Sequence, residues 1–178
     1  MIRLFALFLL LTGFNSFSQE AIKLRPSPLA IASSRYKDTY LKIVYSQPQK
    51  RGREIFGSLV PYGEVWRTGA NEATEITFTK DIMVNNLLMK AGNYSLFTIP
   101  DQDSWTIIFN SELGLWGSYN YNSKLDILRF KVPVQHIEDL IYESFTITVD
   151  QKNDKADFTL MWDRTRISFP IQFIEIKP

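Results

Sequence analysis

The stretch Glu75 to Asn110, EITFTKDIMVNNLLMKAGNYSLFTIPDQDSWTIIFN, consists of short apolar runs separated by turn residues. Its first run alternates polar and apolar side chains, with Ile76 and Phe78 on one face, which is typical of a half-buried strand. The dipeptide Asn85-Asn86 tolerates left-handed backbone and predicts a tight hairpin. This stretch therefore predicts an antiparallel meander of short strands.

Apolar runs of the same kind continue on both sides of this stretch. They predict strands over Tyr40 to Ser46, Ile127 to Val132, Glu143 to Asp150, Ala156 to Asp163 and Arg166 to Ile176. Residues 134–141 are expected to form a short helix or an irregular turn, and residues 19–38 an N-terminal arm along a sheet edge. About nine strands without crossover helices predict an all-β antiparallel sandwich or jelly roll, as a single domain over residues 39–178.

The N-terminus has the order of a secretory signal peptide. A cation at Arg3 precedes the apolar run Leu4 to Leu11, and Ser16-Phe17-Ser18 provides small residues for cleavage after Ser18. The apolar run is shorter than the roughly 20 residues that a spanning helix needs. The sequence thus predicts a signal peptide over residues 1–18 and a mature protein that is periplasmic or secreted, with no membrane insertion.

Charge and composition exclude several classes of function. The chain has 20 basic and 19 acidic residues, and loss of Arg3 with the signal peptide leaves 19 of each, so nothing favours nucleic acid as a partner. It has no cysteine, and its one histidine is His136. Zinc sites, cysteine nucleophiles and disulfides are therefore excluded, and no phosphate-binding glycine loop is present. We predict no metal and no cofactor.

The connection before the Glu75 strand is unusually rich in charge, glycine and aromatic residues. It contains RGREIFG at residues 51–57 and YGEVWRTGANEAT at residues 62–74. Arg51, Arg53 and Arg67 each present a planar fork of donors that binds carboxylate or phosphate bidentately. They either converge on an anionic ligand or pair with acids of the same connection. Those acids are Glu54, Glu64 and Glu72.

Asn71 and Glu72 also have two interpretations each. Glu72 is a tentative catalytic acid or base, or else the counter-ion of Arg67 or Arg53. Asn71 either orients a ligand or caps a turn through its own backbone, and the second role is favoured. The loop aromatics either stack on a ligand or form lids over the core. They are Tyr62, Trp66, Trp116, Tyr119 and Tyr121.

Four motifs in order, RGREIFGSLVPYGEVWRTGANEAT, KAGNYSLFTIP, WTIIFN and WGSYNYNSKLDILRFKV, resemble the domain-of-unknown-function family 2911 over about residues 25–176. That family occurs mostly in exported proteins of Gram-negative bacteria. The resemblance implies a single all-β domain behind a signal peptide and carries over no activity. The family pattern emphasises Arg53, Trp66, Arg67, Gly69, Asn71, Glu72, Trp116, Gly117, Tyr119, Tyr121 and Arg129.

Three functions remain open from the sequence. The first is a binding module for a small polar, anionic or saccharide ligand. Its predicted ligand-binding residues are Arg53, Trp66, Arg67, Asn71, Glu72, Trp116, Tyr119, Tyr121 and Arg129. The second is a cell-envelope hydrolase or lyase that uses Glu72 and Arg67. The third is a structural role in which Arg67 and Glu72 form an internal ion pair and an exposed face binds a protein partner.

Overall fold

The computed structural model describes residues 24–174, so the predicted signal peptide and the last residues of the final predicted strand lie outside it. The described chain forms twelve strands and one short 3₁₀ helix, η1 (Ser123–Leu125). The strands are β1 (Leu29–Tyr36), β2 (Thr39–Ser46), β3 (Ala70–Phe78), β4 (Ile82–Val84), β5 (Leu87–Met89), β6 (Gly92–Ile99), β7 (Ser104–Asn110), β8 (Asp126–Pro133), β9 (Gln135–His136), β10 (Tyr142–Lys152), β11 (Lys155–Asp163) and β12 (Thr165–Phe173). Within residues 24–174 no helix has the length and apolar character to cross a membrane.

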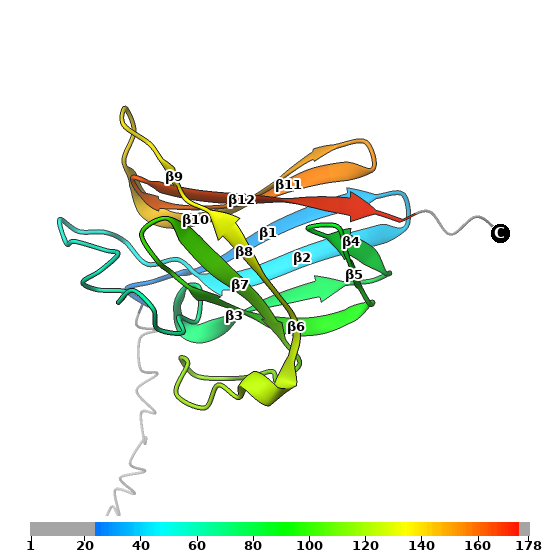
Figure 1. Cartoon of the computed structure of the whole chain (residues 1–178), viewed down its shortest axis with the longest axis horizontal. Coiled ribbons are helices and arrows are strands. Elements are labelled where there is room, and N and C mark those ends of the chain that lie inside the picture. Colours follow the sequence, from blue (N-terminus) through cyan, green and yellow to red (C-terminus); the bar gives the residue numbers. More distant parts are fainter. Residues whose placement is uncertain (1–23, 175–178) are drawn as a thin grey trace, which may run out of the picture.

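The strands form two antiparallel sheets that pack face to face (Figure 1). The first has the order β1-β2-β3-β6-β7-β8, and the second has the order β10-β11-β12-β4-β5, with β9 also paired to β12. The predicted all-β sandwich is confirmed, with twelve strands instead of about nine. The long excursions are the connection between β2 and β3, cyan at the left of Figure 1, and the connection between β7 and β8, yellow-green below it.

Two of the additional strands fall in segments for which the sequence predicted no strand. Residues 29–36, assigned to the arm, form the edge strand β1, from which Ala30, Ala32 and Tyr36 pack toward the core. Leu29 and Ile31 are 59% and 64% exposed, so β1 lacks the usual apolar-in, polar-out alternation. The sandwich therefore begins earlier than residue 39. Residues 134–141 contain the two-residue strand β9 and no helix.

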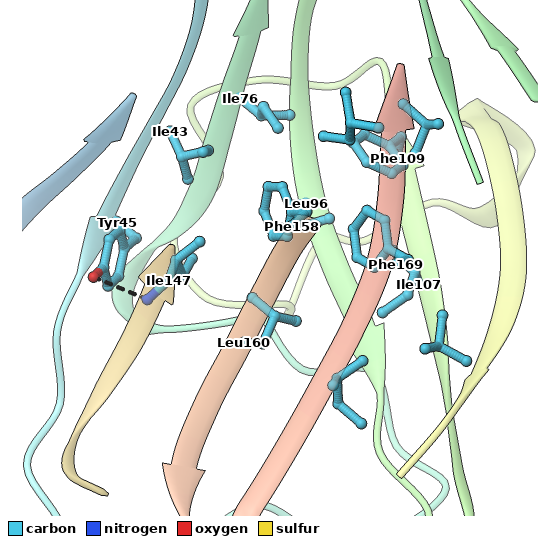
Figure 2. Packing of buried hydrophobic residues seen from close by; sticks show 14 of the residues in the cluster. Ile43, Tyr45, Ile76, Leu96, Ile107, Phe109, Ile147, Phe158, Leu160 and Phe169 are labelled. Atoms are coloured by element: carbon cyan, nitrogen blue, oxygen red, sulfur yellow. Dashed lines mark hydrogen bonds between the residues drawn. The ribbon is translucent and has the colours of Figure 1, made fainter. Parts of the chain in front are cut away.

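The core lies between the inner faces of the two sheets (Figure 2). Leu41, Ile43 and Tyr45 of β2 point into the core, and Phe158 and Leu160 of β11 enter it from the other sheet. The Tyr45 hydroxyl accepts a hydrogen bond of 3.1 Å from the backbone N–H of Ile147 in β10, as the dashed line in Figure 2 shows. This bond satisfies a buried polar group and ties the sheets together.

Five aromatic rings form a cluster at the end of the sandwich where β2 leaves the first sheet. Trp66 stacks on Trp162, with ring centroids 5.9 Å apart and an interplanar angle of 17°. Phe56, Trp105 and Phe145 surround this pair in edge-to-face contacts. Such pairs stabilise beyond the area that they bury, by about 0.5–1.5 kcal/mol each. The cluster anchors the β2–β3 connection, so Trp66 belongs to the core and not to a free loop.

The β2–β3 connection is also fastened to the second sheet. Its residues 48–50 run beside β10, with Phe145 N–H donating to Pro48 O at 2.9 Å and Lys50 N–H donating to Glu143 O at 2.6 Å. The ammonium of Lys50 forms a half-buried ion pair of 2.7 Å with Asp163. The connection therefore closes one end of the sandwich as an ordered layer.

The β7–β8 connection covers part of the outer face of the first sheet. Phe97 of β6 and Ile108 of β7 point away from the main core and are nevertheless fully buried. Leu115 and Tyr121 of the connection pack over them, with the Tyr121 and Phe97 ring centroids 5.1 Å apart. This packing explains why β6 and β7 are apolar on both faces.

Candidate functional site

The backbone around Arg67 is held in one conformation. Trp66 pairs with Thr98 through two backbone hydrogen bonds of 2.7 and 2.9 Å, and its indole N–H donates to Gly69 O at 3.0 Å. Thr68 is fully buried with a φ of +54°, a left-handed conformation that is unusual for a β-branched residue. Such strain costs about 1–3 kcal/mol and persists only where the surroundings impose it. Arg67 is thus presented by a rigid, strained turn.

Gly69 completes this turn because no side chain fits there. A Cβ at Gly69 would lie 3.0 Å from Ser46 O and 3.1 Å from Thr74 Oγ1. The same Thr74 hydroxyl donates to Thr68 O at 2.6 Å, which fixes the peptide on the other side. Asn71 follows with a φ of +57°, a conformation that asparagine tolerates better than most residues. The TGAN motif is therefore a conformational signature of the turn.

A cavity of about 300 Å³ opens beside this turn. It lies between the turn, the N-terminal segment and the aromatic cluster. The lining residues include two arginines, one amide and no acid. They are Ser27, Pro48, Arg53, Leu59, Val60, Trp66, Arg67, Gly69, Ala70, Asn71 and Trp162. We call this cavity the arginine pocket.

The guanidinium of Arg67 has no partner in the described chain. Its side chain is partly buried, its Nε is fully buried, and it makes no hydrogen bond or ion pair within residues 24–174. Burial lowers the pKa of Arg67, while Tyr119 acts in the opposite direction. Arginine nevertheless stays protonated in proteins. The pocket therefore contains a partly desolvated positive charge with no counter-ion within residues 24–174, which is costly in the absence of a ligand.

Arg53 and Asn71 have partners that orient them without neutralising the pocket. Arg53 donates from Nε to Lys50 O at 3.0 Å and from Nη2 to Gln49 O at 2.5 Å. Within residues 24–174 it has no carboxylate partner. The amide nitrogen of Asn71 donates to Ser27 O at 3.4 Å and to Ser46 Oγ at 3.3 Å. Both side chains are thereby held at the pocket wall.

Glu72 lies outside the arginine pocket, and the predicted Arg67–Glu72 ion pair is wrong. Both carboxylate oxygens of Glu72 accept from Arg25 Nη1, at 2.8 and 2.9 Å. Between the pairs Val44–Glu75 and Ser46–Ala70, β2 advances two residues while β3 advances five, so a bulge redirects Glu72. Glu72 then lines a separate hollow of about 170 Å³. That hollow is lined by Leu29, Val44, Tyr45, Ser46, Glu72, Ala73, Glu75 and Gly114.

The electrostatics of Glu72 also differ from those of a catalytic acid. The hydrogen bond from its own backbone N–H has the largest effect and lowers the pKa of Glu72, burial opposes it as the next largest effect, and Arg25 and Ser46 lower the pKa further. A general acid needs a raised pKa. Glu72 is therefore an ordinary ionised carboxylate that pins the N-terminal segment to β3.

Tyr119 lies beside the arginine pocket. Gly117 N–H donates to Asn71 O at 2.9 Å, which brings the β7–β8 connection next to a pocket residue. A Cβ at Gly117, whose φ is +69°, would lie 2.8 Å from Cε2 of Tyr119. The Tyr119 ring therefore lies against Gly117, in space that a side chain at this position would occupy. Tyr119 is 83% exposed. Trp116 is 60% exposed and pairs with Glu72 in an isolated bridge, away from Arg67.

Tyr121 and Arg129 belong to a different cluster. The Tyr121 hydroxyl donates to Asp126 Oδ2 at 2.7 Å, and Arg129 Nη1 donates to the same oxygen at 3.3 Å. Asp126 Oδ1 accepts at 2.9 Å from the fully buried Asn110, whose amide also donates to Asn122 O and accepts from the N–H of Glu112. These contacts fasten the β7–β8 connection. We call Asn110, Tyr121, Asp126 and Arg129 the asparagine cluster.

Of the predicted site residues, the structure brings Arg53, Trp66, Arg67 and Asn71 into one pocket, with Tyr119 beside it. Glu72 and Trp116 lie at the separate bridge, and Tyr121 and Arg129 lie in the asparagine cluster. Sequence reasoning missed Ser27 and Trp162 of the pocket, since one lies in the predicted arm and the other reads as an ordinary core residue. No pattern in the sequence connects either residue to Arg67.

The fold and this pocket define an antiparallel β-sandwich protein with a basic cavity at one end. The chain belongs to the family described as "Protein of unknown function (DUF2911)", whose model matches residues 27–171. Neither the curated proteins nor the solved structures contain a match to the chain. Within residues 24–174 there is no group of three or more His, Asp or Glu side chains placed to hold a metal ion.

Proposed function

We propose that this chain is an exported protein that binds a small anionic ligand in the arginine pocket. One observation carries the proposal: Arg67 is partly buried, lines a cavity and has no counter-ion within residues 24–174. A carboxylate or phosphate at its Nε–Nη edge would supply the missing partner through charge-assisted hydrogen bonds. The signal-like N-terminus supports export to the periplasm or beyond.

The surroundings of Arg67 favour an anion over a neutral ligand. Arg53 adds a second positive charge to a lining that contains no acid. The strained turn at Thr68 fixes the backbone of Arg67 before any ligand arrives. Preorganised donors lose little entropy when a ligand binds, which is how a small pocket reaches useful affinity. Strained backbone of this kind is concentrated at ligand-binding and active sites.

The two alternatives based on Arg67 and Glu72 lack the required geometry. An enzyme that used this pair would need both side chains at one reacting group, yet Glu72 is held by Arg25 beside another hollow. A structural ion pair would need direct contact, which the two residues do not make. Anion binding therefore has the stronger support.

Titration with acetate and with inorganic phosphate tests the proposal. Trp66 and Trp162 line the pocket, so we expect either anion to change the tryptophan fluorescence at constant ionic strength. Replacing Arg67 with methionine keeps an unbranched apolar stem and removes the guanidinium with its charge. We expect Arg67→Met to weaken binding about tenfold or more, the effect of losing a hydrogen-bonded charge.

Arg129→Met is the matched control. It removes an arginine that already has an acidic partner outside the pocket, so anion affinity should stay at the wild-type value. Absence of any response to both anions would overturn the proposal. Equal loss of affinity in the two variants would also overturn it, because the effect would then reflect net charge and not the pocket.

A further inference from the structure

The arginine pocket contains a hydrogen-bond acceptor as well as donors. The amide nitrogen of Asn71 is engaged with Ser27 O and Ser46 Oγ, which fixes the orientation of the amide. Its oxygen, Oδ1, accepts no hydrogen bond within residues 24–174. This oxygen is not fully buried, so a ligand can reach it. Acetate offers only acceptors and would leave this oxygen to solvent. A ligand with a hydroxyl or N–H donor in addition to its anionic group would engage both Arg67 and Asn71.

The pocket also has an aromatic ring beside it. Tyr119 is 83% exposed and lies close enough to Arg67 to affect the pKa of the guanidinium. The Tyr119 ring lies against Gly117, whose backbone N–H donates a 2.9 Å hydrogen bond to Asn71 O. An exposed ring that lies against Gly117 offers an apolar face next to the polar groups of the pocket. A sugar ring presents both an apolar C–H face and hydroxyl donors.

We infer that the ligand is an anionic sugar, whose carboxylate or phosphate binds Arg67, whose hydroxyl donates to Asn71 and whose ring packs on Tyr119. This inference rests on the proposed anion binding and adds the chemical class of the ligand. The pocket of about 300 Å³ has room for a group of the size of one sugar unit. Any further units would extend past Tyr119 into solvent.

Two pairs of probes test this inference. Glucuronate is compared with acetate, and glucose 6-phosphate with inorganic phosphate, by calorimetric titration of the wild-type protein at constant ionic strength. We expect at least one sugar to bind about tenfold more tightly than the anion that lacks the sugar, from the added hydrogen bond and ring contact. The pair that shows the gain identifies the anionic group. Glucose alone should not bind measurably.

The variant Tyr119→Ala tests whether the aromatic ring contributes to the higher affinity for the sugar. The side chain is mostly exposed, so its removal should leave the fold intact. We expect the variant to lose the share of the gain that the ring contact supplies, measured against its own affinity for the corresponding simple anion, while Tyr119→Phe keeps the full gain. If acetate and phosphate bind as tightly as their sugars, the sugar assignment is overturned and anion binding stands. If no probe binds, both proposals fail.

Discussion

Arg67 and Arg129 are two arginines of one chain whose side chains lie in contrasting environments. Arg129 donates to Asp126 beside the Tyr121 hydroxyl, within a cluster whose buried amide makes three hydrogen bonds. Arg67 lines a cavity, and its buried Nε has no partner within residues 24–174. Since both residues belong to the motifs of the same sequence family, their motif membership does not distinguish them.

The difference between them is how completely each charge is compensated. A satisfied polar network stabilises the fold and leaves nothing for a ligand to supply. An unpaired charge beside a cavity destabilises the free protein, and an anion that pairs with the charge recovers that free energy on binding. The asparagine cluster is therefore architecture, and the arginine pocket is the candidate site. Variants that change stability without binding, or binding without stability, test whether the asparagine cluster and the arginine pocket have these different roles.

The largest expected effect on stability is that of Asn110→Ala. It leaves the N–H of Glu112 and the carbonyl of Asn122 without their side-chain partner, so we expect a loss of about 2–4 kcal/mol in the free energy of unfolding. Urea denaturation measures this loss. Asn120→Ala, at an exposed asparagine whose side chain makes no hydrogen bond within the described residues, should stay within about 0.5 kcal/mol of wild type. Phosphate and acetate affinity should not change. A selective loss of affinity in folded Asn110→Ala would break the distinction.

A smaller effect, with a characteristic pH dependence, is expected for Tyr121→Phe. Desolvation and the hydrogen bond to Asp126 raise the pKa of Tyr121 from 10.0 to about 12. Because the folded pKa is the higher one, this stabilisation is complete below pH 10.0 and is lost as the pH rises through about 12. Tyr121→Phe should lower stability by about 1–2 kcal/mol at neutral pH and remove this part of the alkaline loss.

Thermal or urea unfolding across that alkaline range measures the effect of Tyr121→Phe. Tyr119→Phe is the control, since its exposed hydroxyl makes no hydrogen bond within the described residues. An identical alkaline profile for wild type and Tyr121→Phe would show that the hydroxyl does not stabilise the cluster.

The smallest effect is expected for Glu72→Gln. Its pKa is lowered from 4.5, so its stabilising contribution is present above pH 4.5 and is lost as the pH falls through the folded value. The Glu72–Arg25 pair is exposed on both sides, and such pairs contribute about 0–1 kcal/mol. Unfolding on either side of pH 4.5 should show a small difference only above it. Loss of anion binding in Glu72→Gln would show that Glu72 contributes to the anion-binding site.

The sequence predicted the fold well where local pattern determines structure. Alternation placed Ile76 and Phe78 on one face of a strand, and both are buried in the core; Asn85-Asn86 forms the connection between β4 and β5 as predicted. The edge strand β1 escaped prediction because its first half lacks the usual alternation: Ala30 and Ala32 face the core, while the apolar Leu29 and Ile31 face outward. Alternation is informative only when burial and hydropathy agree.

The site was predicted less completely, since its geometry depends on backbone conformation. Arg67 and Glu72 are close in sequence, but left-handed residues at Thr68 and Asn71 and a bulge in β3 separate their side chains. The fixed partner of Glu72 is Arg25, 47 residues away along the chain. No local pattern reveals such a partner. The sequence identified the important connection and could not say which of its charges remain unpaired.

Thermal unfolding of wild type and Arg67→Met, each with and without inorganic phosphate at constant ionic strength, tests the central claim most directly. Because the substitution removes an uncompensated buried charge, we expect the ligand-free variant to melt at or above the wild-type temperature, a gain of up to about 1 kcal/mol. Phosphate should raise the melting temperature of wild type only. A ligand-free variant that melts well below wild type, with no phosphate effect on either protein, would contradict the account and make Arg67 part of the architecture.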